Sequence, residues 1–266
     1  MKLDYAFRYP TAVRRLVDVF NMINKFKYDK KYSEYFTILD CIKDVHVDER
    51  CFIVGTAPSL NKTNLSLLKD EYVFGVNTLY KAIDRIGKTP QYWGITDVDV
   101  FKQIGLQVLE LNTILFLTGK AGMHYLDNKD DYRYCRDPIV VKNLGRMNYW
   151  DRFGHDLKKG VYGGRTVVID SCIQTAYHLG FSEVYLLGCD CDYSKGHHFD
   201  GKEHAHVKAK EAGKPMSEQV DRERVMDSYK VCRRAFECRG KKIVNCTVGG
   251  RLEVFPRMKL EDVICN

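Results

Sequence analysis

The chain has 266 residues, of which 45% are hydrophobic and 29% charged, and its net charge is +7 at pH 7. This length suits one large α/β domain or two small ones, and the balance excludes a mainly disordered or collagen-like chain. No apolar run approaches the roughly 18 residues of a membrane-spanning helix, and charged residues interrupt the N-terminal segment, so we expect neither a transmembrane helix nor a signal peptide.

Residues 1–48 are predicted to form a helical, basic N-terminal extension. Apolar residues recur at helical spacing between Val13 and Ile23, and residues 1–31 contain eight basic and three acidic side chains. Two interpretations remain open: a helix docked on the following domain, or an amphipathic segment lying on an anionic membrane surface.

Residues 49–266 alternate short β-rich runs with helical patterns. Strands are predicted at 51–55, 72–77, 92–96, 113–117, 139–144, 183–188 and 242–247, and helices at 78–86, 98–111, 166–179 and 219–239. Near-continuous apolar strands between helices indicate a mostly parallel sheet covered on both faces. We therefore predict a single Rossmann-like α/β domain over 49–266. Residues 119–138 and 192–218 look irregular, and the second segment is interpreted as a lid.

A loop of small residues follows the first predicted strand. Gly55, Thr56, Ala57 and Ser59 lie where a doubly wound sheet binds ligands, so backbone N–H groups could approach a phosphate or sugar. The loop lacks the lysine of a P-loop, and a tight strand-to-helix turn explains it equally well.

The next two predicted strands also end in polar residues. Asn77 and Thr78 follow the second strand, and Asp97 follows the third. Asn77 offers a donor and an acceptor for a ribose or a base edge, and Asp97 offers an acceptor for a ligand hydroxyl. Both Asn77 and Asp97 are equally consistent with caps of the helices that follow.

A third motif, Gly163-Gly164-Arg165-Thr166, opens the helix predicted at 166–179. Free N–H groups and the positive end of the helix dipole favour an anion there, and Arg165 adds a bidentate donor for phosphate or carboxylate. Capping of the helix by Thr166 is the structural alternative.

The richest segment follows the strand at 183–188. It contains Asp190, Asp192 and Tyr193, and half of the eight histidines, at 197, 198, 204 and 206. Three interpretations remain open here: a divalent-cation site built on Asp190-x-Asp192, acid/base chemistry by a histidine near neutral pH, or a solvated polar loop.

The ten cysteines form no C-x-x-C pair, and several lie in apolar runs, which is typical of reduced, cytosolic, packed thiols. The positive charge is local rather than spread over the surface, because residues 208–242 contain eleven basic and six acidic side chains. We therefore expect a phosphate-bearing ligand or an anionic lipid surface, and no nucleic-acid partner. The sequence leaves a homo-oligomer open.

The ordered motifs over roughly 51–250 resemble the bacterial sialyltransferases of glycosyltransferase family 42. They also resemble the wider MptE-like group, which includes flagellin-glycosylation factors and an archaeal pterin pyrophosphokinase. The shared pattern is a strand before GTAPSL, a strand before Asn77, GGRT before a helix, and EVYLLGCD before Tyr193.

The resemblance implies roles for matching residues. GTAPS corresponds to the sialyltransferase loop G-N-G-P-S that contacts CMP, with Thr56 in place of Asn, and Asn77 corresponds to a nucleotide-binding Asn. Arg165-Thr166 partly matches the Arg before the next binding helix, and Tyr193 inherits stabilisation of the leaving phosphate. The family's general-base His aligns near Arg224, which is not a His, so His198, His204 and His206 are the candidate substitutes.

These motifs lead to one expected function and two rivals. The expected protein is a glycosyltransferase, cytoplasmic or peripheral on the inner face of the membrane. It would move a sugar, best described as sialic acid or a related nonulosonate, from a CMP-activated donor to a glycan hydroxyl without a required cofactor. The rivals are an ATP- and Mg²⁺-dependent pyrophosphokinase, whose metal would lie on Asp97, Asp190 and Asp192, and a non-catalytic nucleotide- or carbohydrate-binding module.

Overall fold

The computed structural model describes residues 30, 32–147, 152–192, 198–201 and 218–265. Seven parallel strands form one sheet in the order β5-β4-β3-β2-β1-β8-β9. They are β1 (Arg50–Val54), β2 (Tyr72–Val76), β3 (Tyr92–Ile95), β4 (Ile114–Thr118), β5 (Ile139–Val141), β8 (Glu183–Leu187) and β9 (Lys242–Asn245). A separate pair of parallel strands consists of β6 (Asn143–Arg146) and β7 (Val161–Gly163).

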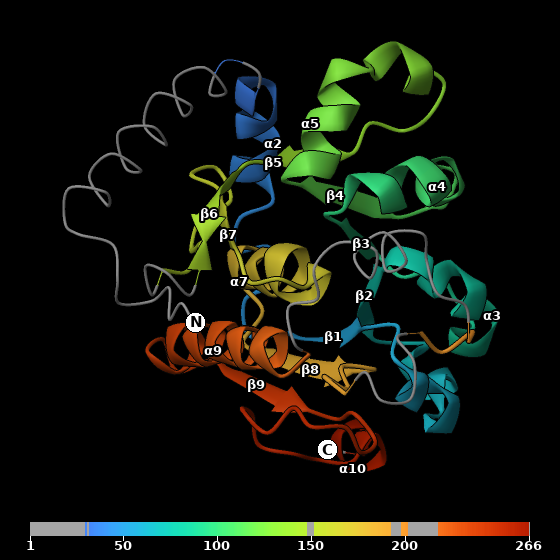
Figure 1. Cartoon of the computed structure of the whole chain (residues 1–266), viewed down its shortest axis with the longest axis vertical. Helices are drawn as coiled ribbons and strands as arrows, with labels where there is room; N and C mark the ends of the chain where they lie inside the picture. Colours follow the sequence, from blue (N-terminus) through green and yellow to red (C-terminus); the bar gives the residue numbers. More distant parts are fainter. Residues whose placement is uncertain (1–29, 31, 148–151, 193–197, 202–217, 266) are drawn as a thin grey trace.

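Helices cover both faces of this sheet, with α7 and α9 on one side and α3 and α4 on the other (Figure 1). The α-helices are α2 (Phe36–Cys41), α3 (Ile83–Ile86), α4 (Val98–Leu109), α5 (Lys120–Asp127), α7 (Gln174–His178), α9 (Glu218–Glu237) and α10 (Leu260–Ile264). The 3₁₀ helices are η1 (Ser33–Tyr35), η2 (Pro58–Lys62), η3 (Leu65–Leu68), η4 (Asn77–Ala82) and η5 (Lys129–Tyr132), and η6 (Val168–Ile173) is a π-helix that continues into α7.

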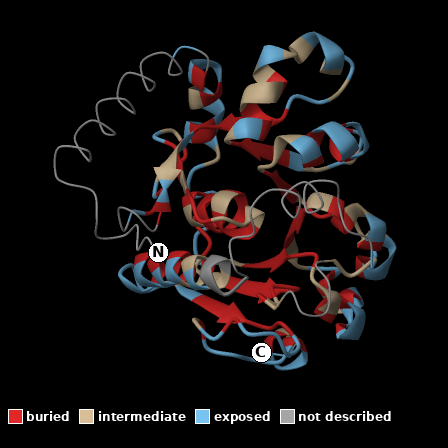
Figure 2. Ribbon diagram, viewed as in Figure 1, coloured by how far each residue is buried: buried red, intermediate tan, exposed pale blue. Residues whose placement is uncertain are grey.

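The sheet is buried on both faces, as the continuous apolar runs predict (Figure 2). Phe52, Trp93 and Phe116 are among its fully buried side chains. Close packing requires glycine at position 75 of β2, because a Cβ there would lie 2.6 Å from the Trp93 ring of β3. Tyr35 and Leu39 belong to the same core, so residues 33–41 of the predicted extension pack on the domain.

All seven predicted strands are present, and the predicted α/β class is confirmed. Three details of the prediction were wrong. The run 139–144 is divided between β5 and the small sheet, the irregular segment 119–138 contains α5 and η5, and the helix at 166–179 begins as a π-helix. Residues 1–29, which carry the amphipathic pattern, lie outside the described residues.

All ten cysteines are free thiols, and six of them are buried. Burial raises the pKa of Cys172 and Cys232, so these thiols are protonated at neutral pH and serve packing. Within the described part of the chain, no helix combines the length and apolarity that crossing a membrane requires.

Candidate functional site

The strand order reverses at β1, which pairs with β2 on one side and β8 on the other. The chain runs from β1 outward to β5 and then returns to add β8 and β9 on the opposite side. In open α/β sheets, ligands bind in the crevice outside the carboxyl ends of the strands at such a switch point. A ligand-binding site is therefore expected at the loops after β1 and β8.

Backbone hydrogen bonds join these two loops. The N–H of Gly55 donates to the carbonyl of Leu187 over 2.8 Å, and the N–H of Ala57 donates to the carbonyl of Gly188 over 3.2 Å. The N–H of Ser59, in the first turn of η2, donates to the Asp190 carboxylate over 3.1 Å. The loop predicted from the sequence is thus held in a fixed position against the end of β8.

Asn77 lies beside this loop, at the carboxyl end of β2. It is the first residue of η4 and its side chain does not cap that helix. Its Oδ1 atom is buried and accepts no hydrogen bond within the described residues. Its φ of 44° is in the left-handed region. A buried acceptor without a partner costs about 1–3 kcal/mol, so this atom is open to a donor from a ligand or from water.

Left-handed backbone is concentrated at this edge. Among described non-glycine residues, φ is positive at Asn77, Arg165 and Cys191, and elsewhere only at Asp44 and Asp48 in the turn before β1. Residues held in sparsely populated conformations cluster at functional sites. The three loops after β2, β7 and β8 therefore share a feature that the sequence did not reveal.

The Gly164–Thr166 loop rests on an acidic side chain. The N–H of Gly164 donates to Asp170 Oδ1 over 2.5 Å, and the Arg165 N–H also reaches this carboxylate. Burial raises the pKa of Asp170 to about 7, despite the opposing effect of these N–H groups and of Arg146 and Arg165. Thr166 caps the helix, because its Oγ1 accepts from the N–H of Ile169 over 3.3 Å.

Asp170 is a site residue that the sequence analysis missed. It stands inside an apolar helical pattern, where nothing marks it as different from a solvent-facing residue. Its position in a π-helix and its raised pKa are both features that recur at functional sites. At neutral pH the carboxyl can take up or release a proton beside Arg165.

Asp170 should make the stability of the fold depend on pH. A carboxyl pKa raised from 3.8 to about 7 means that the folded state binds the proton more tightly than the unfolded state. The free energy of unfolding should therefore fall as pH rises from about 4 to about 7, by at most about 4 kcal/mol. Asp170→Asn should abolish this contribution while the exposed Asp99→Asn keeps it, as measured by urea unfolding at a series of pH values. Parallel pH profiles for the wild type and Asp170→Asn would contradict the assignment.

One part of the predicted lid contacts the loop after β1. His198 Nδ1 lies 3.0 Å from Thr56 Oγ1, and the N–H of Phe199 donates to the carbonyl of Thr56 over 2.8 Å. Lys81 and Asp200 form an ion pair of 2.5 Å next to it. His198 is thus brought to the candidate site. Tyr193, His204 and His206, with most of 192–218, lie outside the described residues.

The three carboxylates considered for a metal each have protein contacts. Asp97 caps α4 by accepting the N–H groups of Asp99 and Val100, Asp190 accepts the N–H of Ser59, and Asp192 lies 3.4 Å from Arg251. The described residues contain no group of three or more His, Cys, Asp or Glu side chains with metal-binding geometry.

Arg222 is a second residue that the sequence analysis did not single out. It lies in the first turns of α9, close enough for its charge to oppose the burial that raises the pKa of Cys191 to about 12. Its Nε atom is buried and donates no hydrogen bond within the described residues. A guanidinium in this position adds positive potential beside the end of β8.

The strand order and the helices on both faces define a doubly wound α/β protein whose switch point lies at β1. A family model described as "6-hydroxymethylpterin diphosphokinase MptE-like" matches residues 21–196. The chain belongs to this MptE-like family. The predicted resemblance to the MptE-like group is confirmed, and the narrower resemblance to the family 42 sialyltransferases stays a prediction.

Other comparisons found distant similarity or none. The solved structure of the MAf glycosyltransferase from Magnetospirillum magneticum AMB-1 is 14% identical, with a TM-score of 0.49. The match covers 85% of this chain and 38% of that chain, so the present chain spans well under half of that protein. No curated protein matches the sequence.

Proposed function

We propose that the chain is a glycosyltransferase that binds a nucleotide-activated sugar at the switch point between β1 and β8. The observation that carries this proposal is the buried Oδ1 atom of Asn77, which accepts no hydrogen bond among the described residues. Asn77 follows β2, next to the loop of small residues that is hydrogen-bonded to the end of β8. Backbone N–H groups and an amide at strand ends suit the phosphate and the ribose or base of a nucleotide.

The proposed donor is CMP-linked sialic acid or a related nonulosonate, and the acceptor is a hydroxyl of a cell-surface glycan such as lipooligosaccharide, capsule or flagellin. The loop Gly55–Ser59, Asn77 and Thr78 would bind the nucleotide, and Arg165 would bind the donor carboxylate or phosphate. The bond between the anomeric carbon and the phosphate oxygen breaks, and the acceptor oxygen bonds to that carbon. His198 takes the acceptor proton, and Tyr193 assists the leaving phosphate. His204 and His206 are the alternative bases.

Binding of CMP, UDP, GDP and ATP, each with and without Mg²⁺, tests the proposal. We expect CMP to bind without metal, and Asn77→Ala to weaken it about 5- to 150-fold, because the amide partner is lost. Calorimetry measures the CMP affinity of the wild type and of the variant. Asn112→Ala, which lies before the amino end of β4, serves as control. If Asn77→Ala binds CMP with unchanged affinity, the nucleotide does not bind at this site.

A second candidate is diphosphoryl transfer from ATP, which the description of the matching family favours. It predicts that ATP binds in preference to CMP and only with Mg²⁺. Binding of nucleotide without any turnover of activated sugar or ATP would instead support the non-catalytic module.

We also propose that the basic segment 1–31 brings the protein to the inner, anionic face of a membrane that holds the acceptor. Eight basic and three acidic side chains give this segment a charge of +5, and each basic residue near such a surface contributes about 1 kcal/mol at low salt.

A further inference from the structure

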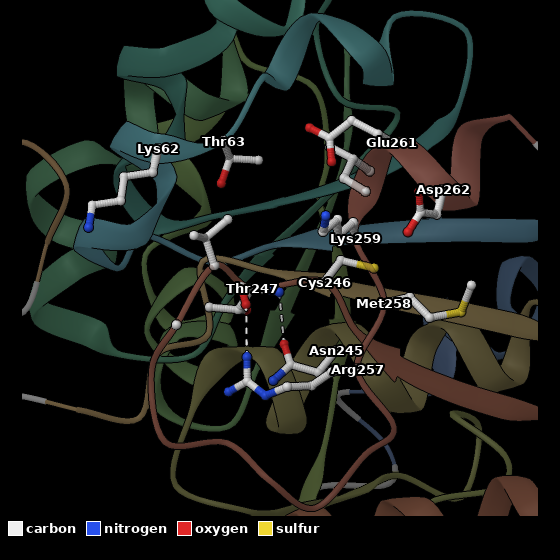
Figure 3. A pocket seen from close by; sticks show the side chains of 13 residues that line it. Lys62, Thr63, Asn245, Cys246, Thr247, Arg257, Met258, Lys259, Glu261 and Asp262 are labelled. Atoms are coloured by element: carbon white, nitrogen blue, oxygen red, sulfur yellow. Dashed lines mark hydrogen bonds between the residues drawn. The ribbon is translucent and has the colours of Figure 1, made fainter.

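A cavity of about 480 Å³ opens at the carboxyl end of β9 (Figure 3). The loop 246–249, residues 257–262 and the end of η2 line it. Its buried lining includes the polar side chains of Thr63, Asn245 and Thr247. Two exposed lysines, Lys62 and Lys259, belong to its rim. These residues lie outside the sequence motifs GTAPSL, GGRT and EVYLLGCD.

The wall of this cavity is fixed by side-chain hydrogen bonds. Asn245 accepts the N–H of Thr247 over 2.9 Å and donates to the carbonyl of Leu252 over 2.8 Å. Arg257 donates to the carbonyl of Thr247 over 2.9 Å and pairs with Glu253. Figure 3 shows both Asn245 and Arg257 below Thr247. A ligand would therefore meet a cavity that is already formed, which reduces the entropy lost on binding.

The cavity adjoins the end of β8. The N–H of Cys189 donates to Thr247 Oγ1 over 3.1 Å, and the N–H of Arg251 donates to the carbonyl of Asp190 over 2.6 Å. Gly250 packs so closely here that a Cβ on it would lie 2.7 Å from the Asp190 carbonyl oxygen. Asp190 thus connects the two regions. Its carbonyl accepts the N–H of Arg251 beside the cavity, and its carboxylate accepts the N–H of Ser59 in the loop after β1.

The chemistry of the rim favours an anion. Lys62 and Lys259 form no ion pair with the described residues, whose ion pairs involve other lysines. In Figure 3, Lys259 lies between Glu261 above and Asn245 below, and Lys62 lies on the other side of the cavity with its amine directed away from the other labelled side chains. The backbone N–H groups of Val248 and Gly249 donate no hydrogen bond to other described backbone groups. Successive free N–H groups in a turn beside cations form an anion-binding concavity.

We propose that this cavity is the acceptor subsite, and that it binds a sugar carrying a phosphate or a carboxylate. Lys259 binds the anionic group, the exposed side chain of Lys62 turns toward that group when the ligand binds, and the polar lining from Thr63 and Thr247 contacts the sugar hydroxyls. This inference rests on the proposed glycosyl transfer, because only a transferase has an acceptor. It adds that the acceptor sugar is anionic. Glu261 and Asp262 also line the cavity, and they disfavour a polyanion over a single anionic group.

The test uses three sugars that share a pyranose ring: glucose 1-phosphate, glucuronate and glucose. Calorimetric titration of the full chain at low salt should show binding of at least one anionic sugar, and at least tenfold weaker binding of glucose. The preferred anion distinguishes phosphate from carboxylate. Lys62→Met and Lys259→Met should each weaken binding up to about fivefold, as expected for loss of one exposed ion pair of about 1 kcal/mol. Lys69→Met, outside the cavity, should bind as the wild type does.

Two further measurements separate this inference from the proposed function. The lysine variants should keep wild-type CMP affinity, and Asn77→Ala should keep wild-type affinity for the anionic sugar. Equal binding of glucose, wild-type binding by both lysine variants, or loss of sugar binding in Asn77→Ala would overturn the acceptor subsite. Failure of CMP to bind would instead overturn the proposed nucleotide site and leave the sugar result to be judged independently.

Discussion

Replacing His198 by alanine should lower kcat by about 10²- to 10⁴-fold with little change in donor affinity, as expected for loss of a general base. His198 Nδ1 lies 3.0 Å from Thr56 Oγ1, so the imidazole is held over the loop proposed to bind the nucleotide. A base must be unprotonated to accept the acceptor proton. The wild-type rate should therefore fall toward acid pH, and this acid limb should vanish in the variant.

Two variants control for structural effects of the change. Thr56→Val should misplace the ring and lower kcat less than His198→Ala, while keeping the acid limb. His124→Ala, on α5, should retain wild-type kcat. If His198→Ala transfers sugar at the wild-type rate, His198 is not the base. Asp170, with a pKa of about 7, is then the next group to replace among the described residues.

The scaffold of this site was predictable because its signals are local. Apolar runs such as Cys51–Gly55 and Glu183–Gly188 are long enough to identify buried parallel strands. Once strands are placed, Asn77, Asp97 and Asp190 fall at one edge of the sheet by geometry. The structure then separates residues that look alike in sequence: Asp97 caps α4, whereas the Asn77 side chain caps nothing.

Features that depend on distant contacts were not predictable. Asp170 has a raised pKa because the fold buries it under the Gly164–Arg165 loop, and its neighbours in sequence do not indicate this. Lys62 and Lys259 both line the cavity at β9, although most of the chain separates them in sequence. Helix α5 was missed because its residues, which include Gly122 and His124, give a weak apolar pattern.

Replacing Gly55 by alanine should weaken both the fold and nucleotide binding. An added Cβ would lie 2.3 Å from the carbonyl oxygen of Gly188 and 3.3 Å from Cys189 Sγ. The nearer atom is backbone, so the clash can be relieved only by moving the ends of β1 and β8 apart. Overpacking of this kind costs about 1–3 kcal/mol, which should lower Tm by roughly 3–10 °C. The hydrogen bonds from Gly55 to Leu187 and from Ala57 to Gly188 should lengthen, and the loop should lose its shape for phosphate.

Gly240→Ala is the matched control for this change. A Cβ on Gly240 meets open space, but its φ of 69° is in the left-handed region, so alanine there should cost about 1 kcal/mol by strain alone. Gly240→Ala should therefore lower Tm slightly and leave CMP affinity at the wild-type value, whereas Gly55→Ala should lower both. Thermal unfolding and calorimetry distinguish the two variants. If Gly55→Ala unfolds at a lower temperature but still binds CMP normally, the loop after β1 supports the sheet and does not contact the nucleotide.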